Sequence, residues 1–545
     1  MRKYYNDLKA YGMKKSYIVP VLLIALLCFG YAITNASINI DNLEGDRYVN
    51  GNVMLAAGRF GITLMSMFTG DWATAYVNDI LSVVFLLWTA TNICILFDRV
   101  SGGRINSYAR TIFSCAFVSY PLIHEIWPYS AYSPSFCLLF MSWALLLVYA
   151  CIRKRQQNRF GMILAAVLLM MLVCAGYESI VPVYIFFVFA LLSLQIVYGT
   201  EQEKKLRTVL QNGMVFAGVL VVGLLLRVAV HQITLAVLDL ESATNGATEI
   251  YWSKYSVDSI IKSLFVGFAK NYVLKGIIYF PITELLAAGV AFLIIGFFAC
   301  KKHGALLLVP GLGMLLSLIL LSIVQGEVSP YRTCQVFGAF VSFVAMILAD
   351  LFQEGAWHKW VKNAGLVLLA YLCFYQATYV NYYMVQNHLR SEEEAFVIRQ
   401  IGMELQGEYS IEKPVIFVGN YALSESIQEA ISVPESSASW QAYKTIFIAC
   451  YDVMGETYDE TKLSRRLPQT NVNSVLEWGV YSYNQEAMQN LFAYYGFDYV
   501  LADYELVYDE ACQYAVTEQM PSYPQNGYIR DVGEYIIVRL GEVEG

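Results

Sequence analysis

Residues 17–34 read YIVPVLLIALLCFGYAIT, a run without a single charge that is about as long as a helix must be to cross a bilayer. Comparable runs recur as far as residue 385. The whole chain is 57% hydrophobic and 15% charged, whereas soluble domains carry roughly 25% charged residues. The sequence therefore predicts a polytopic α-helical membrane protein.

The apolar runs predict about eleven membrane spans. A basic stretch precedes the first run, but no small-residue cleavage pattern follows it, so we interpret residues 17–34 as an uncleaved span and not as a signal peptide. After this first span, we place the others at 73–97, 111–127, 135–152, 160–176, 180–198, 209–230, 281–300, 304–324, 333–352 and 364–385.

Basic residues cluster in alternate connections between these spans. Every cluster falls on one side of the membrane if the eleven spans alternate in direction, and basic loops mark the cytoplasmic side. The pattern predicts a multi-pass membrane protein with a cytoplasmic N-terminus. The clusters lie at the N-terminus and around Arg99, Arg153, Lys204, Lys301 and Lys359.

We expect two domains, a membrane domain at 1–385 and a small extracytoplasmic α/β domain at 386–545. The second holds 25 acidic residues against nine basic ones. An acidic balance argues against nucleic acid as a partner, because nucleic acid requires a basic face. Short β-rich runs alternate with helical stretches in this region. These runs are PVIFVGN at 414–420, TIFIACYD at 445–452, DYVLAD at 498–503 and EYIIVRL at 534–540.

The first outward loop is the strongest candidate for chemistry. Residues 40–61 read IDNLEGDRYVNGNVMLAAGRFG and contain Asp41, Glu44, Asp46, Arg47 and Arg59. Charges beside a bilayer are costly to hold close together unless they pair or bind something. A carboxylate here could act as general base toward a sugar hydroxyl. The alternative is a solvated acidic loop in which Arg47 pairs with a neighbouring acid. We expect the apolar stretch Val53 to Phe68 to form one interfacial helix.

Further polar groups fall on the outward side. Arg332, next to Tyr331, follows a predicted span, and a guanidinium there could hold a lipid-linked phosphate through two hydrogen bonds or merely anchor the chain at headgroups. Glu178 lies in an outward turn, and Lys275 lies in NYVLKGIIYF, a predicted re-entrant or interfacial helix. Glu284 falls near the start of a span, where carboxylates usually face a cavity.

Several other chemistries find no support in the motifs. His124 and Glu125 do not form HExxH, because residue 128 is Pro, and we interpret His124 as structural. GLGMLL at 311–316 lacks the third glycine of a dinucleotide loop, and no Walker A motif occurs. No CxxC spacing is present, so no metal site is predicted, although Cys450 and Cys512 could either pair or remain free thiols.

The sequence resembles the GtrII-type glucosyltransferase family of bacterial membrane proteins. The resemblance lies in the order of a first span and an acidic outward loop, and in the short motifs Asp41-Asn42 and Gly58-Arg59-Phe60. The resemblance implies a GT-C-like fold and an enzyme that moves a hexose from a polyprenyl-phosphate donor to a surface glycan. The family's name indicates that the hexose is glucose. It implies a catalytic acid in the first loop, and Asn42 in place of a second acid leaves Asp41, Glu44 and Asp46 as alternatives.

By the same resemblance, Asp41 is the preferred base because it lies at the mouth of the first span. The substrate-binding residues would then be Arg47, Arg59, Glu178, Tyr331, Arg332 and Lys275, with the cations stabilising the leaving phosphate. No nucleotide cofactor is expected, and the role of a divalent metal stays open. The partners implied are a polyprenyl-phosphate-linked sugar, a glycan acceptor and the lipid bilayer.

Two functions from other classes compete with this one. A transporter or flippase of a lipid-linked glycan would also need polar groups within its spans, but the hydropathy shows no paired halves. A membrane sensor with a glycan-binding ectodomain would not need eleven spans. Convergence of Asp41, Glu178 and Arg332 on one outward cavity would favour the transferase over both.

Overall fold

We describe the protein from a computed structural model that carries all side chains. Asp41, Glu44, Asp46, Arg47 and Glu125 lie outside the described residues. The structure describes residues 2–35, 37, 52–69, 75–124, 127, 132–153, 159–242, 250–354, 358–409, 412–454, 463–466, 475–478 and 482–543.

The chain divides into two compact units, which we call unit 1 and unit 2. Unit 1 comprises Met1–Thr34, Arg47–Tyr382 and Glu435–Leu463, and unit 2 comprises Asn35–Asp46, Tyr383–Pro434 and Ser464–Gly545. A segment from the C-terminal part of the sequence therefore belongs to unit 1, which the expected division at residue 385 does not include. That segment carries helix α20 (Ala438–Met454).

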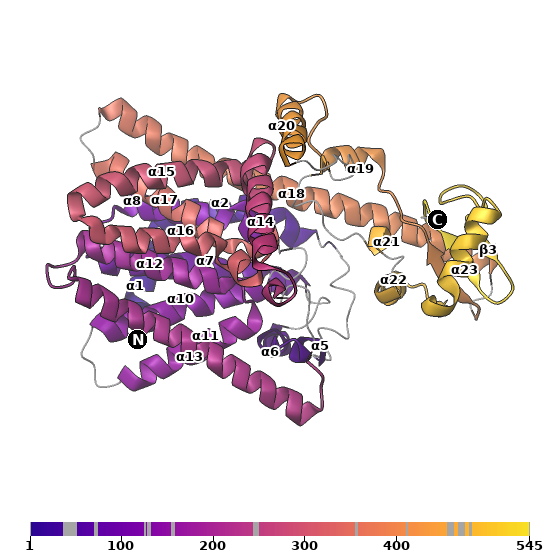
Figure 1. The fold of residues 1–545 in the computed structure, drawn as a ribbon, viewed down its shortest axis with the longest axis horizontal. Helices are drawn as coiled ribbons and strands as arrows, with labels where there is room; N and C mark the ends of the chain where they lie inside the picture. Colours follow the sequence, from indigo (N-terminus) through magenta and orange to yellow (C-terminus); the bar gives the residue numbers. More distant parts are fainter. Residues whose placement is uncertain are drawn as a thin grey trace. The chain divides into compact units, whose positions relative to one another are not determined.

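Unit 1 is a bundle of apolar helices (Figure 1). Within the described ranges, ten helices are long and apolar enough to cross a membrane. They correspond to ten of the predicted spans and are α2 (Lys15–Thr34), α7 (Ala75–Ser101), α10 (Tyr132–Arg153), α11 (Arg159–Gly176), α12 (Ile180–Tyr198), α13 (Leu206–Leu238), α15 (Phe280–His303), α16 (Leu308–Gln325), α17 (Gln335–Glu354) and α18 (Lys359–Glu408).

The eleventh predicted span, at 111–127, is a shorter helix. Helix α8 (Ser107–Ser119) has 13 residues and is followed by a single 3₁₀ turn, η2 (Pro121–Ile123). At 1.5 Å per residue α8 spans only about 20 Å, and Pro121 opens the following turn because the residue before a proline is disfavoured in the α conformation. Helices α2, α7 and α17 pack against α8, so the thickness of the lipid layer does not determine its length. The count of eleven stays a prediction.

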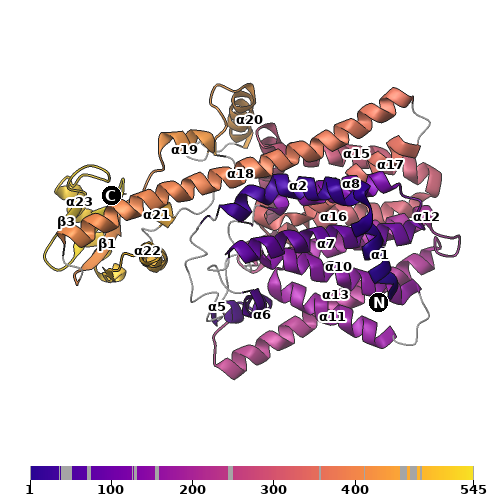
Figure 2. The same cartoon turned by 180° about the vertical axis from the view of Figure 1, so that it is seen from behind.

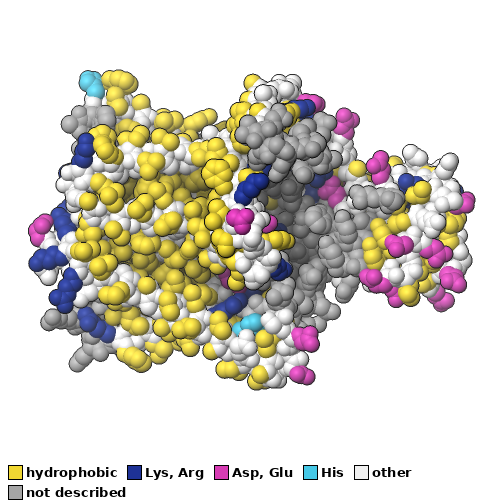
Figure 3. Space-filling view, viewed as in Figure 1, with side chains coloured by type: hydrophobic (Ala, Val, Ile, Leu, Met, Phe, Trp, Pro, Cys, Tyr) yellow, Lys and Arg dark blue, Asp and Glu magenta, His cyan; other side chains and the backbone are white. Residues whose placement is uncertain are grey.

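One end of the bundle is basic. The N-terminal helix α1 (Arg2–Met13) lies there, where Asp7 accepts two hydrogen bonds from Arg99 at the end of α7. Arg153 at the end of α10 pairs with Glu203 in the connection between α12 and α13. Figure 3 shows Lys and Arg side chains gathered along the same edge of the bundle. We call this the basic end.

Short helices cross the opposite end. Helix α14 (Val257–Phe268) runs across the direction of the spanning helices (Figure 1). Its Ile260 and Leu264 are buried, whereas Ile261 and Phe265 are 57% and 75% exposed, as expected of a helix that lies in a membrane interface. One π-helical turn, η5 (Ala269–Val273), and one 3₁₀ turn, η6 (Leu274–Ile277), follow in place of a single re-entrant helix.

The expected interfacial helix at Val53–Phe68 is also interrupted. The structure has α5 (Asn52–Ala56) and α6 (Phe60–Thr69), separated by a turn at Gly58. Gly58 has a φ of 72°, a left-handed conformation that only glycine adopts at little cost. The prediction of one continuous helix is therefore wrong. The spacing of apolar residues does not reveal a turn such as the one at Gly58.

Unit 2 holds a four-stranded sheet in the order β2-β1-β4-β3. β1 (Pro414–Val418) pairs in parallel with β2 (Val500–Leu501) and β4 (Ile536–Arg539), while β3 (Ile529–Asp531) is antiparallel to β4. The late part of α18 and α22 (Ser482–Tyr494) cover one face of the sheet. The other face packs against α23 (Tyr504–Thr517). Helix α18 is continuous over its 50 residues, the first part in unit 1 and the rest in unit 2 (Figure 2).

One of the four predicted β-rich runs is helical. TIFIACYD at 445–452 lies within α20, where Trp440, Tyr443 and Phe447 are buried at helical spacing. Packing of this apolar stripe outweighs the β propensity of the β-branched residues, which is a weak preference. The prediction of a strand there is wrong.

Candidate functional site

The candidate site lies at the end of unit 1 opposite the basic end. Arg59 and Glu178 come together there, with 3.6 Å between Nη2 of Arg59 and Oε2 of Glu178. The other oxygen of this carboxylate, Oε1, accepts a hydrogen bond of 2.9 Å from Nη2 of Arg227. Two guanidinium groups thus share one carboxylate, and we call these three residues the arginine cluster.

The Gly-Arg-Phe-Gly segment explains how Arg59 reaches this position. A side chain at Gly58 would place its Cβ 2.9 Å from Nη2 of Arg227, so the glycine leaves room for that guanidinium. At Gly61 a Cβ would lie 2.7 Å from the backbone nitrogen of Gly176, so α6 contacts α11 backbone to backbone. Each glycine of the motif therefore has a packing role beside the arginine cluster.

Arg227 was not predicted from the sequence. It lies in α13, a 33-residue helix about 50 Å long, which exceeds the roughly 30 Å of hydrocarbon that a span must cross. One turn further, His231 binds the carbonyl oxygen of Ala56 at 3.0 Å. The available signal was an arginine inside an apolar run, since charged residues within spans usually face a bundle interior or a cavity.

Arg332 joins this region through the neighbouring turn. The hydroxyl of Tyr177 donates to the backbone oxygen of Arg332 at 3.1 Å. Ser179 donates to Gln335 at 2.7 Å, and the amide of Gln335 donates to the same backbone oxygen. Burial raises the pKa of Tyr177 to about 12, while the positive charges of Arg332 and Arg59 act to lower it. Both guanidinium groups therefore lie within electrostatic reach of Tyr177, beside Glu178.

Tyr331 and Lys275 contact segments outside the arginine cluster. The hydroxyl of Tyr331 donates to the backbone oxygen of Asn271 in η5. Nζ of Lys275 in η6 lies 5.1 Å from the ring centroid of Tyr443 in α20. Burial and the charge of Lys270 lower the pKa of Lys275 to about 8.

Two other polar residues singled out from the sequence have local roles. His124 is buried, binds the backbone oxygen of Val118 at 2.6 Å, and stacks edge-on with Phe29. The structural interpretation of His124 agrees with these contacts. Glu284 accepts a hydrogen bond of 2.7 Å from Gln376, which in turn accepts one of 2.6 Å from Ser119. Glu284 is thus tied to α18 and α8 within the bundle.

The arginine cluster suits an anion. It carries two positive charges against one negative charge, and its side chains are only 18–29% exposed. Nε of Arg59 and Nε of Arg227 are buried and find no hydrogen-bond acceptor among the residues that the structure describes. Buried donors of this kind favour an acceptor such as a phosphate oxygen. Within the described ranges no three His, Cys, Asp or Glu side chains converge, and the role of a metal stays open.

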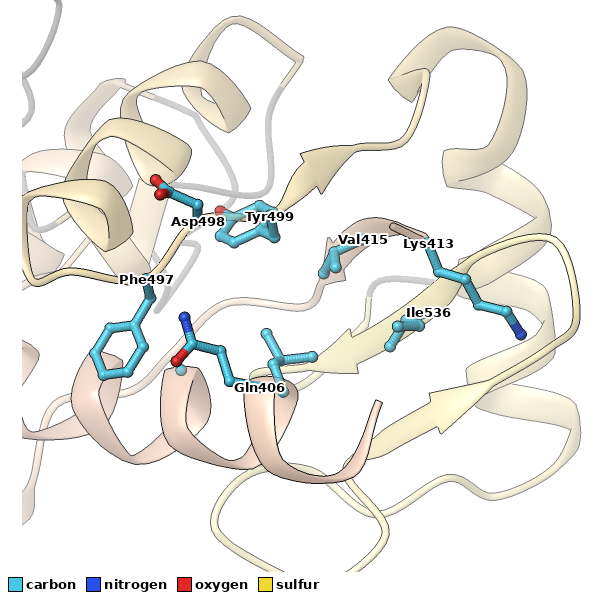
Figure 4. Close-up of a pocket in the computed structure, with 9 residues that line it drawn as sticks. Gln406, Lys413, Val415, Phe497, Asp498, Tyr499 and Ile536 are labelled. Atoms are coloured by element: carbon cyan, nitrogen blue, oxygen red, sulfur yellow. The ribbon is translucent and has the colours of Figure 1, made fainter. Parts of the chain in front are cut away.

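A pocket among the described residues of unit 2 is too small to bind a sugar (Figure 4). It lies between the end of α18 and the sheet, where Gln406, Phe497 and Tyr499 line it. Its volume is about 10 Å³, which is room for one water molecule.

Comparison with known proteins gives a family match. Residues 30–349 match the model of the family described as glucosyl transferase GtrII. The matched range contains the arginine cluster and Arg332. No curated protein matches the chain. The family match covers more than half of the sequence, and the chain belongs to the GtrII glucosyltransferase family.

Proposed function

We propose that this glucosyltransferase moves a glucosyl unit from a polyprenyl-phosphate donor to a cell-surface glycan at the extracytoplasmic face of a bacterial plasma membrane. The arginine cluster is the observation that carries the proposal. Its net positive charge lies at the end of the bundle away from the basic end, and basic loops are retained in the cytoplasm. A lipid-linked donor already carries an activated sugar, so no nucleotide enters the reaction.

The reaction is a displacement at the anomeric carbon. The acceptor oxygen forms the new bond and loses its proton to a carboxylate, while the bond between the anomeric carbon and the phosphate oxygen breaks. The phosphate leaves with the bonding electron pair, and fixed positive groups stabilise the developing charge. We assign this role to Arg59 and Arg227, together with Arg332 in the neighbouring turn. Glu178 holds the two guanidinium groups in place.

The base remains one of Asp41, Glu44 and Asp46, of which we prefer Asp41. Glu178 is engaged by both guanidinium groups, so its oxygens are directed at Arg59 and Arg227. A base must reach the acceptor hydroxyl within hydrogen-bonding distance. A separate carboxylate is therefore required, and the first outward loop is where the sequence supplies one.

The test is transfer of labelled glucose from polyprenyl-phosphate glucose to acceptor glycan in membranes that contain the full chain. We expect the Asp41→Asn variant to lose about a hundredfold or more in rate. The matched control is Asp258→Asn, which removes an exposed carboxylate from α14 and should transfer at the normal rate. Full activity of Asp41→Asn would eliminate Asp41 as the base.

The same assay separates the transferase from a flippase. A flippase relocates the intact donor, so labelled glucose stays attached to polyprenyl phosphate. A transferase releases polyprenyl phosphate in proportion to the glucose that reaches the glycan. Relocation without release would overturn the proposed function.

A further inference from the structure

A cavity of about 180 Å³ lies at the basic end of unit 1, and we call it the basic-end cavity. Its lining residues come from the ends of α7, α10, α12 and α13 and from the connection between α12 and α13. The deepest of them is Phe216, which follows the first residue of α13, Leu206, by about 15 Å along the helix. The ends of spanning helices lie near the membrane surface, so the cavity lies where headgroups meet acyl chains.

The lining of the basic-end cavity is partly apolar and partly polar. The apolar side chains are Val100, Ile152, Leu191, Leu192 and Phe216. The charged side chains of the lining are Arg153 and Glu203, which pair with each other. This pair has no net charge, in contrast to the arginine cluster. Complementary charge therefore favours a zwitterionic ligand over an anion in this cavity.

Hydrogen bonds hold the acceptors of the cavity in place. Nε2 of Gln195 donates to the backbone oxygen of Glu203 at 2.7 Å, and Nδ2 of Asn212 donates to Oε1 of Gln195 at 2.9 Å. Because a backbone oxygen can only accept, these two bonds fix the orientation of both amides. Oδ1 of Asn212 then accepts from no described residue and is left for a ligand. Glu203 is held as well, since its Oε2 accepts from the backbone nitrogen of Thr200 at 2.9 Å.

Arg153 supplies a donor to the same cavity. Its Nε donates to the hydroxyl of Tyr149 at 2.9 Å, and its Nη1 pairs with Glu203. Within the described ranges its Nη2 has no acceptor, and the side chain is 35% exposed. Guanidinium N–H groups bind phosphate oxygens strongly. The cavity thus offers a donor for a phosphate together with acceptors for an ammonium group, at Glu203 and Asn212.

We propose that the basic-end cavity binds a phosphoethanolamine group, with its ammonium at Glu203 and Asn212 and its phosphate at Arg153. The volume fits, since a cavity of about 150 Å³ holds a benzene molecule and this group is only slightly larger. The group belongs to a membrane phospholipid, and the apolar part of the lining takes its first methylene groups. This ligand is not a substrate of glucose transfer, because the cavity and the arginine cluster lie at opposite ends of unit 1.

Lipid selectivity tests the headgroup. The purified full chain in detergent is titrated with phosphatidylethanolamine, phosphatidylcholine and phosphatidylglycerol, and bound lipid is counted by native mass spectrometry. We expect phosphatidylethanolamine to bind about tenfold more tightly than phosphatidylcholine, because a quaternary ammonium has no N–H to donate to Glu203 or Asn212. Phosphatidylglycerol, which has no ammonium, should also bind about tenfold more weakly. Equal affinities for the three lipids would overturn the proposal.

Free phosphoethanolamine separates the two sources of this headgroup. We expect it not to displace phosphatidylethanolamine at the concentrations at which the lipid binds, because it lacks the methylene groups that contact the apolar lining. Displacement at those concentrations would assign the cavity to a soluble phosphoethanolamine and overturn the assignment to a lipid.

A change of charge in the cavity gives a result that a purely structural role would not give. Glu203→Gln keeps the shape of the side chain but leaves the charge of Arg153 unbalanced. We expect it to bind phosphatidylethanolamine about tenfold more weakly, and phosphatidylglycerol about tenfold more tightly, than the wild type does. Glu201→Gln is the matched control, because it changes a 93% exposed side chain of the same connection and should keep the wild-type selectivity. Unchanged selectivity in Glu203→Gln would refute the site.

Asn212→Ala tests the ammonium contact without removing a charge, so it serves even if Glu203→Gln does not fold. We expect it to bind phosphatidylethanolamine about fivefold more weakly and phosphatidylglycerol as the wild type does. Gln211→Ala, at the exposed neighbouring residue of α13, should bind both lipids normally. An equal loss for the two lipids in Asn212→Ala, or no loss for either, would refute the contact of Asn212 with the ammonium.

Discussion

The two ends of unit 1 both hold arginines, which are paired with carboxylates in different ways. At the basic end, Arg99 pairs with Asp7, and Arg110 pairs with Asp98. Arg153 pairs directly with Glu203, and both residues line a cavity of about 180 Å³. At the opposite end, Arg59 and Arg227 share Glu178 alone among the described residues. Each of these three arginines at the basic end thus has a carboxylate of its own, whereas the two arginines of the cluster share one among the described residues.

The physical consequence is a difference in what each end still attracts. An ion pair that is already matched has little to gain from a further anion, and exposed pairs contribute roughly 0–1 kcal/mol. Two guanidinium groups that share one carboxylate retain positive charge in a partly desolvated place, where electrostatic attraction is stronger than in water. Among the described residues, the arginine cluster therefore keeps a net positive charge that can attract an anion.

The largest expected effect comes from removing one guanidinium from each end. Arg227→Gln should lower kcat/KM for glucose transfer about a hundredfold or more, because one donor to developing charge is commonly worth that much. Arg153→Gln, the matched change at the basic end, should alter kcat/KM by less than about threefold, as for other surface pairs. A comparison of initial rates and of thermal unfolding midpoints checks both, and equal losses of rate would refute the contrast between the ends.

A smaller effect should appear on titration of Lys275, one of the predicted substrate-binding residues. Lys275, with a pKa of about 8, is mostly protonated at pH 7 and mostly neutral at pH 9. Its positive charge is therefore lost as pH rises, and binding of polyprenyl phosphate should weaken up to about tenfold between these values. Lys275→Arg should abolish this decline, because a guanidinium stays charged throughout the range.

The control for this titration is Lys262→Arg, which should keep the decline of the wild type. Binding constants at pH 7, 8 and 9 suffice for the measurement. A decline that persists in Lys275→Arg would assign the titration to another group.

Much of unit 1 was predictable because each membrane span is encoded by a long run of apolar residues. Ten of the spans follow from apolar runs. The pairing of Arg59 with Glu178 brings together two residues that were each predicted to bind substrate on the outward side. Arg227 was missed because a single charge barely alters the hydropathy of a 33-residue helix. The three loop carboxylates lie outside the described residues, so their convergence with Glu178 and Arg332 stays a prediction.

Contacts between distant segments could not be predicted from the sequence, for a different reason. The rings of Tyr443 and Phe447 meet lysines about 170 positions earlier in the chain, and cation–π contacts leave no periodic pattern to read. Helix α20 was even predicted as a strand, because its β-branched residues suggest one until the buried stripe is seen. Local propensity yields to tertiary packing at such places.

The last prediction concerns the side of the membrane that each end faces, where no change in activity is expected. Glu201 lies at the basic end with 93% of its side chain exposed, and Lys262 lies on α14 beyond α13. The chain crosses the bundle once between them, through α13, so the two positions face opposite sides whether or not α8 counts as a span. In intact cells an impermeant maleimide should label Lys262→Cys, and it should label Glu201→Cys only after permeabilisation. The reverse result would place the arginine cluster in the cytoplasm, where the basic loops are expected, and extracytoplasmic transfer would then be refuted while the contrast in charge neutralisation between the two ends would stand.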